Sequence, residues 1–400
     1  MEAARSNADE FDLPAALSLL ATAIPFAPPD FDFSQIPQAP GVFVLETGGE
    51  PFLGKSANLR RRLQRLLGLR EEAGQKPSKR LNLRDTAATI HYGLTGSAFE
   101  TWLLLYRTAR ALFPRRYREL LRLRLPPVLK VNLANAYPRC YVTRRLGRGR
   151  ALYYGPFPSR AAAEKFAPQF LDLFLVRRCT EEIRPDPAHP GCIYGEMNMC
   201  LRPCQNACTA GEYAAEVERL SSFLSTGGAS LLKGVEAGRD RASERLDFEE
   251  AAQWHKRAEK IHEALKHRPD LAVDLERLHG LVIQRAAAPG LAAGEDGRAG
   301  MGVPTLQLFP VWRGFLLPPI TFTFEVVEGR PVSLDARLRE AIASIRLAPA
   351  GSSRVRAEHL ALLARWYYRG TRQGEFIPFE SYDRIPFRKI VGAIGRIARG

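Results

Sequence analysis

The sequence has few cysteines, no long apolar run and too little acid to balance its base. Six cysteines in 400 residues are too few for a disulfide-stabilised secreted fold. The uncharged stretch over residues 13–29 is interrupted by prolines and follows acidic residues, which does not fit a signal peptide. No stretch of about 18 apolar residues occurs, so no transmembrane helix is predicted. We expect a cytoplasmic protein without membrane contact.

What the sequence does contain is typical of a globular protein with a polyanionic partner. Apolar residues make up 46% of the chain and charged residues 25%, and the length suggests two or three domains. The 58 lysines and arginines exceed the 43 acidic residues by 15. Such an excess indicates binding to nucleic acid or to an anionic surface.

The basic residues are concentrated in one stretch. Residues 107–150 hold thirteen arginines and lysines but only one acidic residue, Glu119. A solvated helix face would mix the two signs, so this stretch favours contacts with nucleic-acid phosphates. Phosphate contacts carry no sequence information, and non-sequence-specific DNA binding is therefore predicted. The candidate contact residues are Arg60, Arg61, Arg65, Arg107, Arg110, Arg115, Arg116, Arg144 and Arg145.

Five of the six cysteines fall between positions 179 and 208. Cys179, Cys192, Cys200 and Cys204 are separated by twelve, seven and three residues and are the candidate metal ligands. Four thiolates suit either an iron–sulfur cluster or structural zinc, and their spacing does not decide between them. Cys208 is a fifth candidate, whereas the isolated Cys140 is expected to be a buried core thiol.

Local patterns predict several elements. Apolar runs around a glycine turn predict a β-hairpin over residues 41–54, and Asn58 is expected to cap a helix that follows. A strand is expected over residues 90–94 and a helix from Ser97 to about residue 113. Residues 210–268 have a helical pattern with a capping box at Thr209 and Glu212. Residues 286–302 are predicted to be a loop, residues 305–327 antiparallel strand, and residues 336–345 and 356–368 helical.

Short motifs near these elements resemble a known family. Gly41-Val42-Phe43 precedes the hairpin turn, Phe52-Leu53-Gly54 follows it, and residues 55–62 read KSANLRRR. Further on, residues 153–159 read YYGPFPS. With the cysteines and the helical stretch in the same order, the chain resembles the UvrC family over roughly residues 36–285. A length of 400 residues leads us to expect no RNase H-like C-terminal nuclease, as in the shorter Cho-type homologues.

The resemblance implies an α+β multidomain protein. Residues 36–125 would form a small GIY-YIG-like α/β domain after a lead-in over residues 1–35. Residues 126–210 would form a cysteine-rich middle domain and residues 211–268 a UVR-like helical hairpin. Residues 269–400 would form an α+β domain with antiparallel strands whose role the sequence does not indicate.

The resemblance also implies a nuclease whose site is incomplete. Lys55 and Arg62 stand at the family's lysine and arginine positions, but Phe43 and Phe52 replace the two tyrosines. The position of the metal-binding glutamate holds Leu105, and Glu100 is turned too far round the helix to replace it. We therefore expect a degenerate GIY-YIG endonuclease. The alternative is a divergent active endonuclease that makes the 3′ incision with Mg²⁺ or Mn²⁺.

Two further roles are implied by the same resemblance. The cysteine quartet would hold a [4Fe-4S] cluster, with zinc as the alternative. Residues 246–252 (LDFEEAA) resemble the start of the UVR motif, through which the family engages UvrB; the candidate contacts are Leu246, Phe248, Glu249 and Ala252. His255-Lys256 stands where the family has an Arg-Asp pair, which leaves the choice of a UvrB-like partner open. The expected function is DNA binding in nucleotide excision repair. The alternative is a non-enzymatic adaptor protein whose cysteine-rich segment is held together by a metal.

Overall fold

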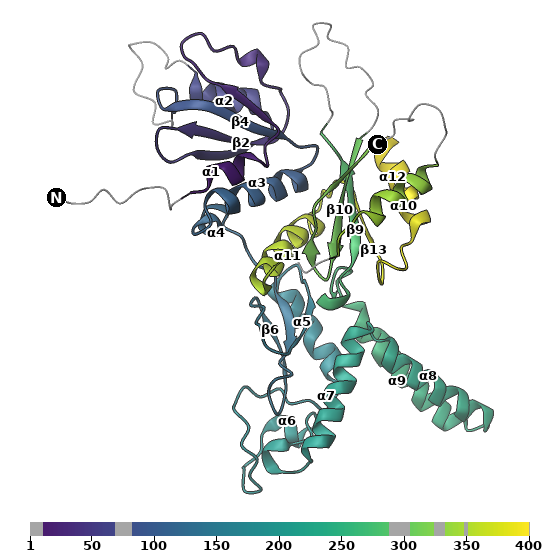
Figure 1. Ribbon diagram of the computed structural model, residues 1–400. Coiled ribbons are helices and arrows are strands. Elements are labelled where there is room, and N and C mark those ends of the chain that lie inside the picture. Colours follow the sequence, from purple (N-terminus) through teal and green to yellow (C-terminus); the bar gives the residue numbers. More distant parts are fainter. Residues whose placement is uncertain (1–10, 69–81, 288–304, 324–332, 348–350, 400) are drawn as a thin grey trace, which may run out of the picture.

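The computed structural model describes residues 11–68, 82–287, 305–323, 333–347 and 351–399. Within these residues the chain builds three antiparallel sheets, each with its own helices, and a helical arm that extends from the middle of the molecule (Figure 1). This is the α+β multidomain architecture expected from the sequence. No helix in the described part of the chain is long and apolar enough to cross a bilayer.

The N-terminal sheet has the strand order β1-β4-β2-β3. Its strands are β1 (Thr22–Pro25), β2 (Gly41–Thr47), β3 (Phe52–Ser56) and β4 (Ala87–Leu94). The hairpin predicted over residues 41–54 is confirmed as β2 and β3. Gly54 is needed there, because a Cβ at this position would lie 2.4 Å from the ring tip of Phe43. The sheet also includes β1, which lies in the segment expected to be a lead-in.

Helices cover both faces of this sheet. Helix α2 (Leu59–Leu67) buries its leucines against one face, and the Asn58 side chain caps it by accepting a hydrogen bond from the Arg61 N–H. Helix α3 (Ala98–Leu112), the helix predicted from Ser97 to about residue 113, covers the other face and contacts α1 (Leu13–Leu17) and α4 (Tyr117–Leu121). A 3₁₀ turn, η2 (Phe33–Gln35), packs near α2.

The middle sheet has the order β6-β5-β7-β8. It consists of β5 (Val128–Val131), β6 (Cys140–Thr143), β7 (Leu152–Gly155) and the distant β8 (Val273–Asp274). Helices α5 (Arg160–Leu171) and α7 (Ala210–Ser225) complete its core. The YYGPFPS segment forms the corner from β7 into α5, with Tyr154 and Phe157 buried and Ser159 capping the helix. Only α6 (Ile193–Glu196) and η3 (Pro203–Gln205) are regular between α5 and α7.

The arm is a hairpin of α8 (Ala229–Glu244) and α9 (Phe248–Lys266), which extends beyond α7 in Figure 1. Its helices pack closely at Gly238, where a Cβ would lie 2.7 Å from the ring of Trp254. The helical prediction for residues 210–268 is confirmed. So is the capping box, in which Thr209 and Glu212 exchange hydrogen bonds at the start of α7.

The C-terminal sheet has the order β11-β10-β9-β13, and β12 also pairs with β10. Its strands are β9 (Gly280–Arg285), β10 (Thr305–Trp312), β11 (Phe315–Leu316), β12 (Ile320–Thr323) and β13 (Glu375–Pro378), preceded by the turn η4 (Leu275–Arg277). Helices α10 (Leu334–Ala343) and α12 (Phe387–Arg399) pack on one face and α11 (Ser353–Tyr367) on the other. The predicted strand and both predicted helices are confirmed where described. Most of the loop predicted at 286–302 lies outside the described residues.

Helix α11 joins the C-terminal domain to α3 of the N-terminal domain. Trp366 packs on Phe99 with ring centroids 5.3 Å apart, and Glu358 accepts 2.9 Å hydrogen bonds from the hydroxyls of Tyr106 and Tyr117. These contacts run in opposite directions along the two helices, so α3 and α11 are antiparallel. A continuous apolar core therefore includes residues of both domains.

Candidate functional site

Phe43 and Phe52, at the two family tyrosine positions, lie together in the N-terminal domain. Their ring centroids are 6.0 Å apart, Phe43 is fully buried and Phe52 is partly buried. The ring of Phe43 packs in the core between the sheet and α2. Two aromatic rings without hydroxyls offer packing area but no group that could take a proton from water.

Lys55 and Arg62 belong to different faces of the same sheet. Lys55 lies on β3, on the face of the sheet that α3 covers. Its Nζ lies 4.7 Å from the ring centroid of Trp102 on that helix. Arg62 is carried by α2, which covers the opposite face. The structure thus brings Phe43 and Phe52 together and carries Lys55 and Arg62 on two different elements, β3 and α2.

An apolar side chain, Leu105, stands where the resemblance leads us to expect the metal-binding glutamate. Leu105 is 7% exposed and packs in the core shared by α3 and α11. Glu100 is used locally, because its Oε2 accepts a 2.7 Å hydrogen bond from the Gly96 N–H before the helix. Burial raises the pKa of this carboxyl to about 7. A carboxyl held in this way closes the helix start and is a poor magnesium ligand.

The basic stretch is mostly exposed and mostly unpaired. Arg116 forms an ion pair with Glu50, and Arg118 lies 3.4 Å from Glu358. No carboxylate pairs with its other lysines and arginines within the part of the chain that the structure describes. The exposed members are Arg110, Arg115, Arg118, Arg122, Arg124, Arg144, Arg145, Arg148 and Arg150.

The predicted arginines of α2 have different roles. Arg61 and Arg65 are exposed. Arg60 instead donates hydrogen bonds to the carbonyls of Ile36 and Ser34, at 2.6 and 2.8 Å, and so holds the preceding turn. This guanidinium already has partners, which leaves it little capacity for phosphate.

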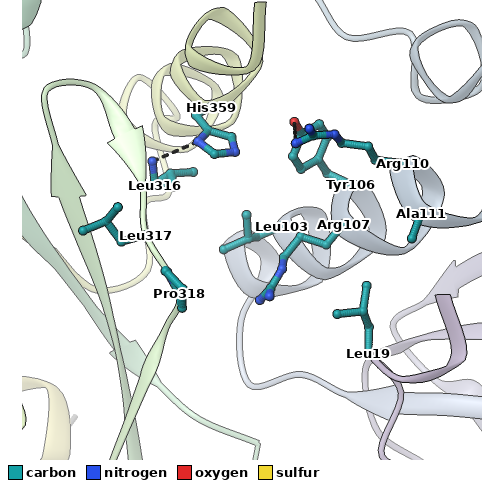
Figure 2. A pocket seen from close by; sticks show the side chains of 10 residues that line it. All are labelled: Leu19, Leu103, Tyr106, Arg107, Arg110, Ala111, Leu316, Leu317, Pro318 and His359. Carbon is teal, nitrogen blue, oxygen red and sulfur yellow. Dashed lines mark hydrogen bonds between the residues drawn. The ribbon is translucent and has the colours of Figure 1, made fainter. Parts of the chain in front are cut away.

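Arg107 and Arg110 border a cleft between α3 and the C-terminal domain (Figure 2). The cleft has a volume of about 410 Å³ and is lined mainly by leucines, proline and alanine. His359 closes it from α11 and accepts a 3.0 Å hydrogen bond from the Leu316 N–H through Nδ1. Burial, followed by the charges of Arg110 and Arg107, lowers the pKa of His359 to about 4, so the imidazole is neutral near pH 7.

The candidate metal ligands lie in a segment with little regular structure, residues 177–209, here called the cysteine segment. Cys179, Cys192 and Cys204 line one cavity of about 110 Å³ together with His189. Cys200 is buried beside them: burial raises the pKa of its thiol to about 11, and the other three cysteines add to the rise. The structure therefore brings all four predicted ligands into one neighbourhood.

The side chains of this neighbourhood are of the right type to bind a metal, but they are not arranged around a common centre. Four thiols are a donor set for iron–sulfur clusters or zinc. Across the described residues, however, no group of three or more His, Cys, Asp or Glu side chains is arranged to hold an ion, so the sulfurs would have to turn towards a common centre. Cys208 packs against the apolar core, and Cys140 is buried in it, as predicted.

The tip of the α8–α9 arm exposes two large apolar side chains. Leu246 and Phe248 are each 71% exposed, and Asp247 between them caps α9 by accepting a hydrogen bond from the Glu250 N–H. Trp254 is packed, with its indole N–H donated to Glu250 over 3.1 Å. The predicted contacts Glu249 and Ala252 lie on α9 near this tip, with Ala252 exposed.

Comparisons with known proteins define the class of the middle domain. Residues 127–223 match the family model "UvrC/Cho excinuclease, middle domain". This range covers the structure from the start of β5 almost to the end of α7. The chain is thus one of the proteins that carry a UvrC/Cho middle domain.

Individual relatives agree with this class. The chain is 31% identical over 238 residues to "UvrABC system protein C" of Trichlorobacter lovleyi, which covers 58% of this chain and 38% of the relative. Proteins of the same name match from Nitratidesulfovibrio vulgaris (33% over 224 residues, 55% and 32%) and Methanothermobacter thermautotrophicus (27% over 242 residues, 59% and 39%). The chain spans less than two-fifths of the length of these relatives. No solved structure matches it.

Proposed function

We propose that this protein binds DNA in nucleotide excision repair. The basic stretch in a chain with a UvrC/Cho middle domain carries the proposal, because its exposed arginines have few carboxylate partners. Unpaired arginines release counterions when they contact phosphates, so binding is expected to weaken steeply with salt. Fluorescence anisotropy with a labelled duplex at several salt concentrations tests this. Affinity that is absent or independent of salt would contradict it and would favour the non-enzymatic adaptor.

The N-terminal domain is proposed to be a GIY-YIG-like domain without hydrolytic activity. Phosphodiester hydrolysis needs a group to activate water and a metal to hold the leaving oxygen. The positions that would supply them hold Phe43, Phe52 and Leu105, all apolar. Purified protein is expected not to nick damaged duplex DNA with Mg²⁺ or Mn²⁺. Nicking that disappears in the Arg62→Ala variant would establish the divergent active endonuclease instead.

The cysteine segment is proposed to hold a [4Fe-4S] cluster through Cys179, Cys192, Cys200 and Cys204. A cluster bound there would tie together a segment that lacks an extensive apolar core of its own. The support is the shared neighbourhood of the four thiols. Iron and acid-labile sulfide should be found in anaerobically purified protein. Zinc in the protein without acid-labile sulfide would instead show that the site binds zinc and not an iron–sulfur cluster.

The arm is proposed to dock a UvrB-like partner through its tip. Leu246 and Phe248 offer apolar area that the protein itself leaves uncovered. A pull-down with UvrB should lose the partner when Phe248 is changed to Glu. Gln253→Glu, an exposed change on the same helix, adds the same charge and serves as the control. Equal capture of both variants would show that the tip is not the contact.

A further inference from the structure

The C-terminal domain places arginines beside Lys55 of the N-terminal domain. The guanidinium carbon of Arg365, on α11, lies 3.8 Å from the ring centroid of Trp102, and Lys55 Nζ lies 4.7 Å from the same centroid. One indole on α3 thus contacts two cations from different domains. Arg369 follows four residues after Arg365, just past the end of α11.

The electrostatics extend this group of cations to four. Burial, followed by the charges of Arg365 and Arg369, lowers the pKa of Lys55. Burial, followed by the charges of Arg369 and Arg124, lowers the pKa of Arg365. Arg124 belongs to the basic stretch, so the group continues the surface proposed to contact DNA.

No acid balances this group of charges. Within the described ranges, no carboxylate forms an ion pair with Lys55, Arg124, Arg365 or Arg369, and all four side chains are exposed. Like charges so close together repel one another, and an anionic ligand relieves that repulsion. A chain of phosphates could contact several of the cations at once, and Trp102 holds two of them near each other through cation–π contacts.

The packing of α11 fixes this arrangement. Trp366, one residue after Arg365, is buried against Phe99 of α3, and Glu358 at the other end of the contact is held by two tyrosine hydroxyls. Tyr368 donates a 2.7 Å hydrogen bond to the Pro156 carbonyl of the middle domain. Arg365 is therefore presented from a docked helix, and Arg369 follows directly after its end.

We propose that Lys55, Trp102, Arg124, Arg365 and Arg369 form a composite site for the DNA backbone, in which the C-terminal domain supplies two of the phosphate contacts. The inference rests on the proposed DNA binding and assigns a role to residues after position 286, for which the sequence indicated none. An acidic protein segment could meet the same charges. DNA is favoured because Arg124 links the site to the basic stretch.

The experiment measures the salt dependence of DNA affinity for the full chain. In the double variant Arg365→Ala/Arg369→Ala, two lost phosphate contacts should reduce the slope of log affinity against log salt by roughly two. Arg354→Ala, an exposed arginine at the start of the same helix, should leave the slope unchanged. Thermal unfolding checks that both variants remain folded.

The outcomes separate this inference from the proposed function. If the wild-type protein shows no salt-dependent DNA affinity, both the proposed DNA-binding function and the composite site are contradicted. Wild-type binding with the same slope in the double variant overturns the composite site alone. So does a double variant that keeps its DNA slope but no longer binds polyglutamate, which would assign the surface to an acidic protein.

Tryptophan fluorescence gives a direct second measurement. The chain has four tryptophans, and DNA at the composite site should change the emission of Trp102. The change should disappear in the Trp102→Phe variant and shrink in the double arginine variant. An emission change on DNA binding that Trp102→Phe leaves intact would contradict contact at this indole.

Discussion

The N-terminal domain and the cysteine segment differ in what they retain. The N-terminal domain has a packed core but lacks the expected reactive side chains, whereas the cysteine segment has its candidate ligands but little regular structure. In the N-terminal domain Phe43, Phe52 and Leu105 occupy positions where the resemblance expects reactive groups, yet the sheet has well-packed helices on both faces. In the cysteine segment all four candidate ligands are present and near one another, but only α6 and η3 are regular. A packed core can therefore persist where chemistry is replaced. The cysteine segment, if it binds the proposed metal, should depend on its ligands for order.

The two regions should respond differently to the same kind of damage. Apolar replacement in a core adds packing and costs little, whereas removal of a ligand from a metal-dependent segment removes the interaction that orders it.

Loss of the metal should unfold the cysteine segment while the N-terminal domain stays intact. Structural zinc in small domains contributes on the order of 10 kcal/mol to folding, and a cluster at Cys200 and its neighbours should have a comparable role. After chelation, or in Cys200→Ser, trypsin should cut rapidly after Arg178, next to the candidate ligand Cys179. Limited proteolysis with mass spectrometry locates the cuts. Protection equal to that of wild-type protein would show that the segment is ordered without metal.

Restoring the carboxylate of the N-terminal domain should destabilise it without restoring activity. Leu105→Glu would place a carboxylate in the apolar core, at a cost of roughly 3 kcal/mol or more in the free energy of unfolding. Phe43→Tyr would add a hydroxyl where the ring tip lies against Gly54. Urea unfolding and nicking assays of the single and combined variants check both points.

Leu105→Met is the matched control, because it keeps the volume and apolar character and should cost less than about 1.5 kcal/mol. Nicking by the combined Phe43→Tyr/Phe52→Tyr/Leu105→Glu variant would mean that the fold has kept the geometry of a nuclease site.

The sequence predicted the local part of the structure well. The caps at Asn58 and Thr209 were predictable because each is a hydrogen bond between residues three positions apart. The β2–β3 hairpin and the helical run after position 210 were found for the same reason. The cysteine neighbourhood was expected from spacing and resemblance, although spacing alone could not show that Cys200 is buried beside the other three.

What escaped prediction depends on distant contacts. The β1–β4 pairing, β8 in the middle sheet and the Tyr106–Glu358 hydrogen bond join residues far apart in the sequence, the last pair by 252 positions. No local pattern marks Trp102 as the contact of Arg365. The unbalanced charge of the basic stretch, which includes Arg124, did not indicate that Arg365 and Arg369 lie near it.

Glu100 should make the stability of the N-terminal domain depend on pH. Burial raises its pKa in the folded protein to about 7, above the ordinary glutamate value of 4.5, so the folded state retains a proton that the unfolded chain releases between these values. Stability from this group is complete at acid pH and is lost as pH rises through about 7. Glu100→Gln removes that loss and keeps an acceptor for the Gly96 N–H.

The expected gain is on the order of 3 kcal/mol at pH 8 as an upper figure, and it should vanish near pH 4. Urea unfolding at the two pH values measures it, with the exposed Glu119→Gln as control. A gain of the same size at both pH values would show that burial of this carboxyl is not its cause. Strong stabilisation of wild-type protein by Mg²⁺, absent in Glu100→Gln, would instead make Glu100 a metal ligand.

The smallest effect is expected at the two cysteines outside the quartet. Cys140 is buried in the middle core, where burial raises the pKa of its thiol to about 12, and Cys208 packs at the edge of the same core. Each should behave as a small apolar side chain, so Cys140→Ala and Cys208→Ala should change stability by about 1 kcal/mol and leave the metal content unchanged. Metal analysis of these variants beside Cys204→Ala sharpens the comparison between the two regions. If Cys208→Ala loses metal while Cys204→Ala keeps it, the ligand set has shifted by one cysteine, and the order of the segment depends on Cys208 in place of Cys204.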